Sequence, residues 1–385
     1  MMVLRSCLFA LLAAASLAAQ TQVDGLSIPS RQAGTTMLHW NAQRVAQGKA
    51  WFAAHPYTPS LSGVTVYSAW RAILAHHVLT GNNADCATAY TFWSDPAKIP
   101  VTFKTASDPA RAYGEYEIMT YDWCSDALPP SQLSVLRTNI NAWVTSCMKA
   151  SWGNKTMSYN NYYWGYVRNE LEWGIASYNE QPAQAQIFLD DVLGSGQRWD
   201  NFKADALTYQ KTGAPLEGTQ YGRYMTWYGM LPFEAAADYG RDLWSETPWF
   251  RDNAFYLIYG ATDTAMKAPG LTALVHQMFS YGDDQFWAGS TAGVESPIGG
   301  ADKGSYNGEF MFEVANRMNP QTAGFAKAWL NTIQPQINQI WTATDVSGSV
   351  VPTSSSQLPL DYQIPGPQMS FSRSAWGGTA FFARA

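Results

Sequence analysis

The stretch NYYWGYVRNELEWGIASYN, residues 161–179, joins the spacing of a helix to a high density of aromatic side chains. Its apolar residues recur at helical intervals, which predicts a helix here. Asn160 and Asn161 stand side by side at its start. The stretch is therefore either an aromatic-rich core helix or the wall of a binding site.

Similar helical patterns follow one another through most of the chain, with prolines near their starts and glycines at their ends. The predicted helices span residues 35–54, 65–81, 110–128, 128–153, 161–179, 182–196, 219–240, 268–282, 308–318 and 322–343. Sequential helices with short loops predict stacked antiparallel pairs. Such pairs form an open solenoid or a closed ring, and the lack of a fixed sequence repeat favours the ring. We therefore predict an all-α fold in which residues 19–344 form an (α/α) toroid, followed by a short C-terminal β segment.

The composition changes after residue 344. Residues 345–368 are rich in Ser, Pro and Gly, which predicts a linker. Residues 369–385 alternate apolar residues with serines before a Gly-Gly pair at 377–378, a pattern typical of a hairpin. They predict the start of an incomplete β-domain. Because two strands alone are marginally stable, they either dock on the helical domain or belong to a longer protein.

The first residues have the pattern of a secretory signal peptide. Arg5 supplies a positive charge, and the apolar run CLFALLAAASLAA that follows is too short to span a membrane. Ser16 and Ala18 fit the small-residue positions before a cleavage site. We therefore predict a signal peptide at residues 1–18 and a secreted or periplasmic protein with no membrane partner after cleavage.

Composition narrows the range of partners. Charged residues make up 14% of the chain, against about 25% in an average domain, whereas Trp and Tyr number 17 and 21. Such side chains serve both cores and sugar-binding grooves, because each has a flat apolar face and a polar edge. The net charge of -6 argues against nucleic acid as a partner. No zinc, phosphate-loop or nucleotide motif is present, so we predict neither a metal nor a cofactor.

Three cysteines follow the predicted signal peptide: Cys86, Cys124 and Cys147. This odd number allows at most one internal pair. In an oxidising compartment, either a Cys86–Cys124 or a Cys124–Cys147 disulfide is possible. Buried free thiols are the alternative.

Four stretches resemble the α/α-toroid polysaccharide lyases of the heparinase II/III-like and alginate-lyase group. YDWCSDALPPSQLSVLRTNI, from residue 121, is similar to a Tyr-Asp-Trp helix end of that family. YNNYYWGYVRNELEWGIA, from residue 159, falls where the family has an Asn-rich active-site segment, often Asn-Asn-His. PLEGTQYGRYMTWYGM, from residue 215, resembles the Glu-Gly segment before its catalytic tyrosine, and PGPQMSFSRSAWGGTAFF, from residue 365, resembles the start of its β-domain. The resemblance implies an exported toroid that cleaves an acidic, uronate-containing polysaccharide by β-elimination.

The resemblance also implies roles for single residues. β-Elimination removes a weakly acidic proton beside a carboxylate, so the site must neutralise that carboxylate and supply a base. By the family match, Asn161, with Asn160 beside it, neutralises the carboxylate, and Tyr224 or Tyr221 transfers the proton. Tyr162 stands where the family has its histidine, and the histidine of the family's β-domain would lie beyond the C-terminus of this chain.

The remaining candidates form a substrate-binding set around these residues. Its further members are Trp164, Arg168, Glu217, Arg223 and Trp227. Each assignment has a structural alternative: the asparagines cap a helix, and the tyrosines, spaced by three, form an aromatic core stripe.

Arg168 also has two interpretations. Its planar guanidinium suits a second uronate carboxylate, which it would hold through two parallel hydrogen bonds. Alternatively it forms an ion pair with Glu170 or Glu172, which are close to it on the same predicted helix.

Two other functions stay open. A toroid glycoside hydrolase needs two carboxylates across a groove. The available carboxylates are Glu115, Glu117, Asp122, Glu170, Glu172 and Glu217. A non-catalytic glycan-binding protein would use the same aromatic surface without turnover. An unsaturated uronate product identifies a lyase, whereas binding without any product identifies the binding protein.

Overall fold

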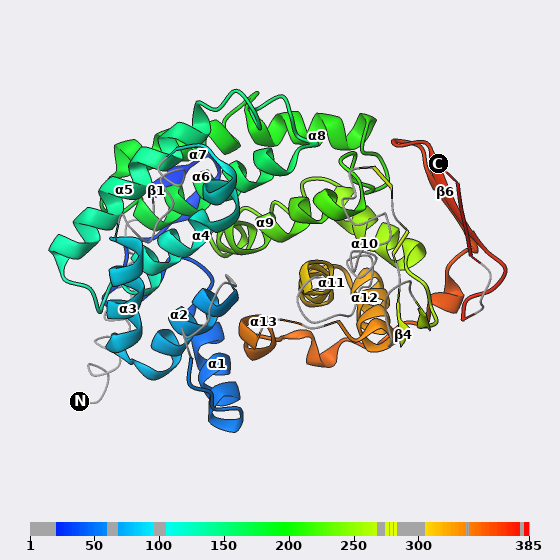
Figure 1. Cartoon of the computed structure of the whole chain (residues 1–385), viewed down its shortest axis with the longest axis horizontal. Helices are drawn as coiled ribbons and strands as arrows, with labels where there is room; N and C mark the ends of the chain where they lie inside the picture. Colours follow the sequence, from blue (N-terminus) through cyan, green and yellow to red (C-terminus); the bar gives the residue numbers. More distant parts are fainter. Residues whose placement is uncertain are drawn as a thin grey trace, which may run out of the picture.

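The computed structural model is predominantly helical and confirms the predicted all-α class (Figure 1). It describes residues 21–59, 68–95, 105–267, 274–276, 278–279, 281–282, 305–335, 337, 339–377 and 381–384. The predicted signal peptide lies outside these residues. The described helices are α1 Ala42–Ala54, α2 Ser68–Thr80, α3 Asn83–Trp93, α4 Asp108–Trp123, α5 Pro130–Met148, α6 Asn161–Ser177, α7 Pro182–Leu193, α8 Arg198–Thr208, α9 Thr219–Asp238, α10 Trp249–Gly260, α11 Ser305–Arg317, α12 Pro320–Ile333 and α13 Gln339–Ala343.

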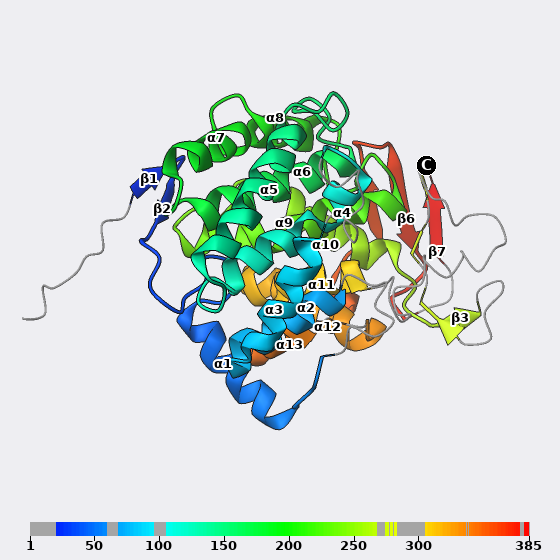
Figure 2. The same ribbon diagram turned by 60° about the vertical axis from the view of Figure 1, so that its left-hand side comes forward.

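Short strands form three small antiparallel sheets in the described parts of the chain. The strands are β1 Thr21–Val23, β2 Leu26–Ile28, β3 Met266–Lys267, β4 Leu274–Val275, β5 Asp361–Ile364, β6 Met369–Arg373 and β7 Phe381–Arg384. Figure 2 shows β1 and β2 at one side of the helical body and β6 and β7 at the other. Of the helices described here, none has the length and apolar character needed to cross a membrane.

Local sequence signals account for several helix ends. At the start of α6, the side chain of Asn160 accepts a hydrogen bond from the backbone nitrogen of Tyr162 at 2.9 Å. Helix α4 follows Ser107, whose side chain caps it, and carries Pro109 in its first turn. Gly81, at φ +74°, follows the end of α2 in the left-handed region that glycine adopts without strain.

The structure corrects two of the predicted helices. Within 268–282, Leu274–Val275 form strand β4, which pairs with β3, so the helix predicted there is wrong. A short apolar run does not distinguish a strand from a helix. The range 322–343 holds two helices, α12 and α13, because the chain turns left-handed at Gln334 (φ 51°) just before Pro335. Helices α3, α8 and α10 lie outside the predicted ranges.

Five helices pack in a connected series: α2 against α4, α4 against α6, α6 against α9 and α9 against α11. Arg71 of α2 joins the ends of this series. Its guanidinium lies 2.7 Å from the carboxylate of Glu115 on α4 and 3.5 Å from that of Glu309 on α11. Helices α3, α5, α7 and α12 pack on the series from outside, as Figure 1 shows for α5 and α7 around α4 and α6.

Helix α6 lies deep inside the protein, which explains its aromatic density. Every residue from Tyr163 to Ser177 is buried. Gly165 allows α4 to approach, since a side chain there would collide with Arg111. Gly174 allows α7 to approach in the same way, because a Cβ there would lie 2.6 Å from the side chain of Leu189. The aromatic-rich stretch at residues 161–179 is therefore a core helix along most of its length.

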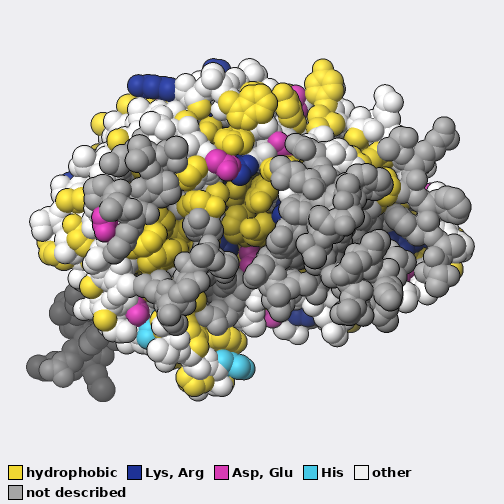
Figure 3. Space-filling model, viewed as in Figure 1, with side chains coloured by type: hydrophobic (Ala, Val, Ile, Leu, Met, Phe, Trp, Pro, Cys, Tyr) yellow, Lys and Arg dark blue, Asp and Glu magenta, His cyan; other side chains and the backbone are white. Residues whose placement is uncertain are grey.

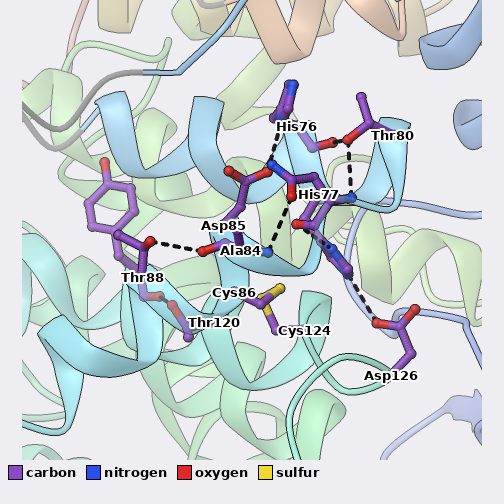
Figure 4. Close-up of a disulfide and its surroundings, with 12 residues drawn as sticks. His76, His77, Thr80, Ala84, Asp85, Cys86, Thr88, Thr120, Cys124 and Asp126 are labelled. Carbon is purple, nitrogen blue, oxygen red and sulfur yellow. Dashed lines mark hydrogen bonds and ion pairs between the residues drawn. A yellow bond between two sulfur atoms is a disulfide. The ribbon is translucent and has the colours of Figure 1, made fainter.

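A disulfide joins Cys86 of α3 to Cys124 at the end of α4 (Figure 4). This selects one of the two pairings that the sequence left open, and Cys147 is a buried free thiol. Beside the disulfide, His76 contacts Asp85. These contacts fasten α3 to α2 and α4 and leave no cysteine pair open for other chemistry among the described residues.

The C-terminal strands dock on the helical body. Strand β5 pairs with β6 and β6 with β7, so the sheet begins at Asp361, inside the range predicted as a linker. The ring of Phe371 is fully buried and lies 6.0 Å from that of Tyr256 on α10. Arg373 donates hydrogen bonds to backbone carbonyls at the end of α10, including that of Tyr259 at 2.8 Å. The short strands are thus stabilised by contact with the helices, the first of the two alternatives drawn from the sequence.

Candidate functional site

The first two turns of four helices bring tyrosines and arginines together. We call the group formed by Arg111 of α4, Tyr162 of α6, Arg223 and Tyr224 of α9, and Tyr306 of α11 the tyrosine–arginine cluster. The Arg111 guanidinium lies 4.5 Å from the ring centre of Tyr162 and 5.6 Å from that of Tyr224. The Arg223 guanidinium lies 4.9 Å from the ring of Tyr306, which is 5.4 Å from Tyr224. These distances place cations against aromatic faces on four separate helices.

The tyrosines of the cluster reach the surface and the arginines lie beneath them. Tyr162, Tyr224 and Tyr306 are half-buried, whereas Arg111 and Arg223 are only 8% and 7% exposed. A ligand arriving from solvent would therefore contact the tyrosines first. The buried arginines behind them would attract its negative charge. Charge of this kind acts more strongly than on the surface, because water screens it less.

Burial lowers the pKa of Arg111, but the neighbouring Tyr228 and Asp108 outweigh it. The pKa of Arg111 therefore lies above the usual value, and the side chain stays cationic. Asp108 pairs with Arg111 at 2.5 Å. Burial, and next the charge of Asp108, raise the pKa of Tyr162, whose hydroxyl donates a hydrogen bond to that carboxylate at 3.2 Å. Tyr162 is therefore a neutral hydrogen-bond donor at ordinary pH.

Asn160 and Asn161 bind a carboxylate, and it belongs to the protein itself. The side-chain amides of Asn160 and Asn161 donate to Oε1 of Glu217 at 3.0 and 2.6 Å, and the backbone nitrogen of Asn161 donates to Oε2 at 2.7 Å. Both asparagines are nearly fully buried, at 4% and 3% exposed. The helix-cap interpretation is confirmed for Asn160. The donors that the family match assigns to a substrate are bonded to Glu217 in this structure.

Tyr221 and Tyr224 lie on one face of α9, and the stripe continues to Tyr228. The rings of Tyr221 and Tyr224 are 6.1 Å apart, and Tyr224 stacks on Tyr228 at 5.2 Å with an angle of 20° between their planes. Tyr221 and Tyr224 are half-buried, whereas Tyr228 is 1% exposed. The stripe therefore runs from the surface into the core. Its inner end, Tyr228, fits the core interpretation, whereas the catalytic role of Tyr221 and Tyr224 stays a prediction.

The structure places three further predicted substrate contacts deeper. Trp164 is 1% exposed and packs edge-on against Phe202 at 4.6 Å, apart from the cluster. Arg168, also 1% exposed, stacks on Tyr228 at 4.4 Å. Trp227 adjoins the cluster, with its ring 4.3 Å from that of Tyr306. Trp227 therefore adjoins a tyrosine of the cluster, and Arg168 adjoins the backbone of Arg111, whereas Trp164 lies apart.

Arg168 does not form the ion pair expected with a carboxylate of its own helix. It lies 3.6 Å from the carboxylate of Glu115, and its Nη2 donates to the backbone carbonyl of Arg111 at 2.6 Å. These contacts with α4 replace the ion pair predicted with Glu170 or Glu172, because the guanidinium of Arg168 lies against α4. Arg168 thus supports Arg111 from below.

Sequence reasoning missed Arg111 and Tyr306, which complete the cluster. Arg111 follows the Asp-Pro pair that starts α4, so a helix-start signal was present, but nothing in the sequence shows that this turn meets α6 and α9. The loop before α6 adds exposed aromatics: Trp152 is 55% and Tyr159 39% exposed. Figure 3 likewise shows hydrophobic side chains gathered with a few charged ones in the middle of the face that it presents.

The carboxylates considered for a hydrolase are buried away from solvent. The residues concerned, Glu115, Glu117, Asp122, Glu170 and Glu172, are each at most 1% exposed. Burial raises the pKa of Glu117 to about 8, and raises those of Glu170 and Glu172 well above the usual value. Glu217 is the remaining candidate and binds the asparagines. The described residues also contain no group of three His, Cys, Asp or Glu side chains able to hold a metal ion.

Comparison of the chain with models of known protein families finds no match, and comparison with curated proteins finds no significant match.

Proposed function

We propose that this protein is a secreted polysaccharide lyase that cleaves a uronate-containing glycan by β-elimination at the tyrosine–arginine cluster. The observation that carries the proposal is the position of Tyr224. It is half-buried, its ring stands 5.6 Å from the Arg111 guanidinium and 5.5 Å from that of Arg223, and it lies within reach of solvent. A tyrosine beside cations is suited to proton transfer, because positive charge stabilises the phenolate.

The proposed chemistry uses the cluster as follows. Arg111 and Arg223 offset the negative charge that develops on the uronate carboxylate when its neighbouring carbon is deprotonated. Tyr224 takes the proton from C5. The electron pair left at C5 then forms the C4–C5 double bond as the C4–O bond breaks. The proton passes from Tyr224 to the leaving oxygen. The Tyr162 hydroxyl donates its proton to Asp108, so at the edge it would accept a hydrogen bond from a substrate hydroxyl.

In this proposal Asn160 and Asn161 act indirectly. They hold Glu217 at the start of α6, and Glu217 precedes the helix that carries Arg223 and Tyr224. The resemblance implies that the asparagines neutralise the substrate carboxylate. In this proposal the arginines neutralise it instead. The asparagines instead fix α6 against α9, so that the cluster keeps its geometry without binding energy from the substrate.

We also propose that the helices form an (α/α) toroid with α2, α4, α6, α9 and α11 as its inner ring. The contact of Arg71 with both Glu115 and Glu309 supports closure of that ring. The Cys86–Cys124 disulfide supports an oxidising, extracytoplasmic location, because disulfides persist there. The partner would be an acidic polysaccharide met by local positive charge, and the net charge of -6 disfavours nucleic acid.

A non-catalytic glycan-binding protein is the second candidate. The observation that favours it is the occupation of the Asn161 amide by Glu217, which removes a donor that the resemblance places at the substrate. The full chain, incubated with alginate, pectate, chondroitin and heparin, tests both functions. A lyase produces rising short-ultraviolet absorbance from unsaturated uronate ends. A hydrolase produces reducing ends without that absorbance, and a binding protein retains the polymer and produces neither.

A further inference from the structure

A second hollow lies away from the tyrosine–arginine cluster, where the C-terminal sheet meets the helical body. This cavity, of about 210 Å³, is bordered by the end of α10, by α12 and by the turn after β6. Two tryptophans, Trp329 of α12 and Trp376 of the turn, form part of its wall, with Asp263, Thr332 and Ser355. None of the helices of the cluster contributes to this lining in the described structure, so it is a separate place.

Trp376 is held rigidly in that wall. Its Nε1 donates to the backbone carbonyl of Leu358 at 3.0 Å, and the Arg373 guanidinium lies 4.5 Å from its ring. Asp263 fixes the same turn, because its Oδ2 accepts from the backbone nitrogen of Gly377 at 2.8 Å and pairs with Arg373 at 3.1 Å. A half-buried aromatic ring locked in this way offers a preformed surface, which reduces the entropy lost on binding.

Trp329 adds a second aromatic ring to the wall. The residue is 6% exposed. It borders the cavity from α12, whereas Trp376 borders it from the turn after β6. A ligand in the cavity would therefore meet aromatic surface from two separate elements.

The charges of the lining define the class of ligand. Asp263 is the charged side chain among the described lining residues, and its charge is balanced by Arg373, which does not line the cavity. A uronate or other anion would meet a carboxylate and no cation. A neutral ligand with several hydroxyls would stack on tryptophan and donate to Asp263. The volume lies below the range of about 300 Å³ upward that is typical of drug-sized ligands, which fits one sugar ring.

We infer that this cavity is a binding subsite for one neutral sugar unit, which would anchor a glycan apart from the tyrosine–arginine cluster. The inference does not require the proposed lyase activity. It is tested with the full chain carrying Tyr224→Phe, so that no turnover interferes, by calorimetric titration with glucose, galactose, mannose, xylose and glucuronate. We expect saturable binding of at least one neutral sugar and no binding of glucuronate at this cavity.

Variants assign the binding to the cavity. Trp329→Phe replaces the indole with a smaller aromatic ring, and should weaken binding about threefold by reducing the apolar contact. Trp376→Ala should weaken it further by removing the stacking face. Trp249→Phe is the matched control, because Trp249 is a buried tryptophan that does not line the cavity. The inference is overturned if no neutral sugar binds, if Trp376→Ala weakens the binding of glucuronate as much as that of a neutral sugar, or if Trp329→Phe and Trp249→Phe have equal effects.

Discussion

Glu217 accepts a hydrogen bond from the backbone nitrogen of Asn161 at 2.7 Å, so a carboxylate of the protein itself occupies the N-terminus of α6. Such an end favours negative charge, because its backbone N–H groups are unpaired and the helix dipole is positive there. The bond ties α6 to the segment leading into α9. The two helices that carry Tyr162 and Tyr224 therefore share one polar joint.

Replacing Glu217 tests this joint. Glu217→Ala leaves the amides of Asn160 and Asn161 without their acceptor, and should lower the free energy of unfolding by about 1–3 kcal/mol. Glu217→Gln retains one acceptor oxygen and should cost less. Urea denaturation of the three proteins measures the difference. Equal stability of Glu217→Ala and the parent would show that the joint contributes nothing.

The disulfide should be a substantial source of stability. It closes a loop with a sequence separation of 38 residues, for which reduction is expected to cost about 2–4 kcal/mol. Cys86→Ser/Cys124→Ser should lower the denaturation midpoint, whereas Cys147→Ala should leave the disulfide intact. Thiol labelling of the native, purified protein should find neither Cys86 nor Cys124 reactive. Labelling of both without prior reduction would contradict the assigned pair.

Stability should fall as the pH rises, because of Glu117. Burial raises the pKa of Glu117 from the ordinary value of 4.5 to about 8, so between these values the folded state holds a proton that the unfolded state has lost. The contribution is fully present below 4.5 and is lost as the pH rises through about 8. The slope should be about 1.4 kcal/mol per pH unit in this window.

Glu117→Gln is the control for that prediction. Glutamine does not titrate and keeps an oxygen for the hydrogen bond that Trp143 Nε1 donates to Glu117 at 2.8 Å. Denaturation midpoints measured from about pH 5 to pH 9 should fall less steeply for the variant than for the parent. Parallel curves for the two proteins would show that Glu117 does not carry the proton.

Trp152 should act as a sugar-stacking residue at the edge of the cluster. It is 55% exposed, and the glycine after it packs against Tyr162, which brings the loop close to the start of α6. Trp152→Ala should raise KM about tenfold with little change in kcat, because stacking holds substrate and transition state alike. Val351→Ala, at a residue 78% exposed on a distant segment, is the control. A loss confined to kcat would contradict the role.

The sequence predicts the helical class well and the site incompletely, for physical reasons. Helix ends are marked by the local hydrogen bonding of Asn160 and Ser107 and by the backbone preference of Gly81. Such signals depend on neighbouring residues in the chain, so the sequence alone reveals them. Arg111 is different, because it belongs to the cluster only through the packing of α4 on α6. Likewise, the amide pair at Asn160 and Asn161 predicts a bound carboxylate, but not that the carboxylate is Glu217.

The proposed role of Tyr224 in catalysis is tested by measuring unsaturated uronate formation by the parent chain, Tyr224→Phe and Tyr228→Phe. Tyr228 is the matched control, since it stacks on Tyr224 but is 1% exposed and its hydroxyl has no described partner. We expect the parent and Tyr228→Phe to release the product from at least one uronate polymer. Tyr224→Phe should bind that polymer and release none. Full activity of Tyr224→Phe, or cleavage by the parent without an unsaturated product, would contradict the proposed role of Tyr224.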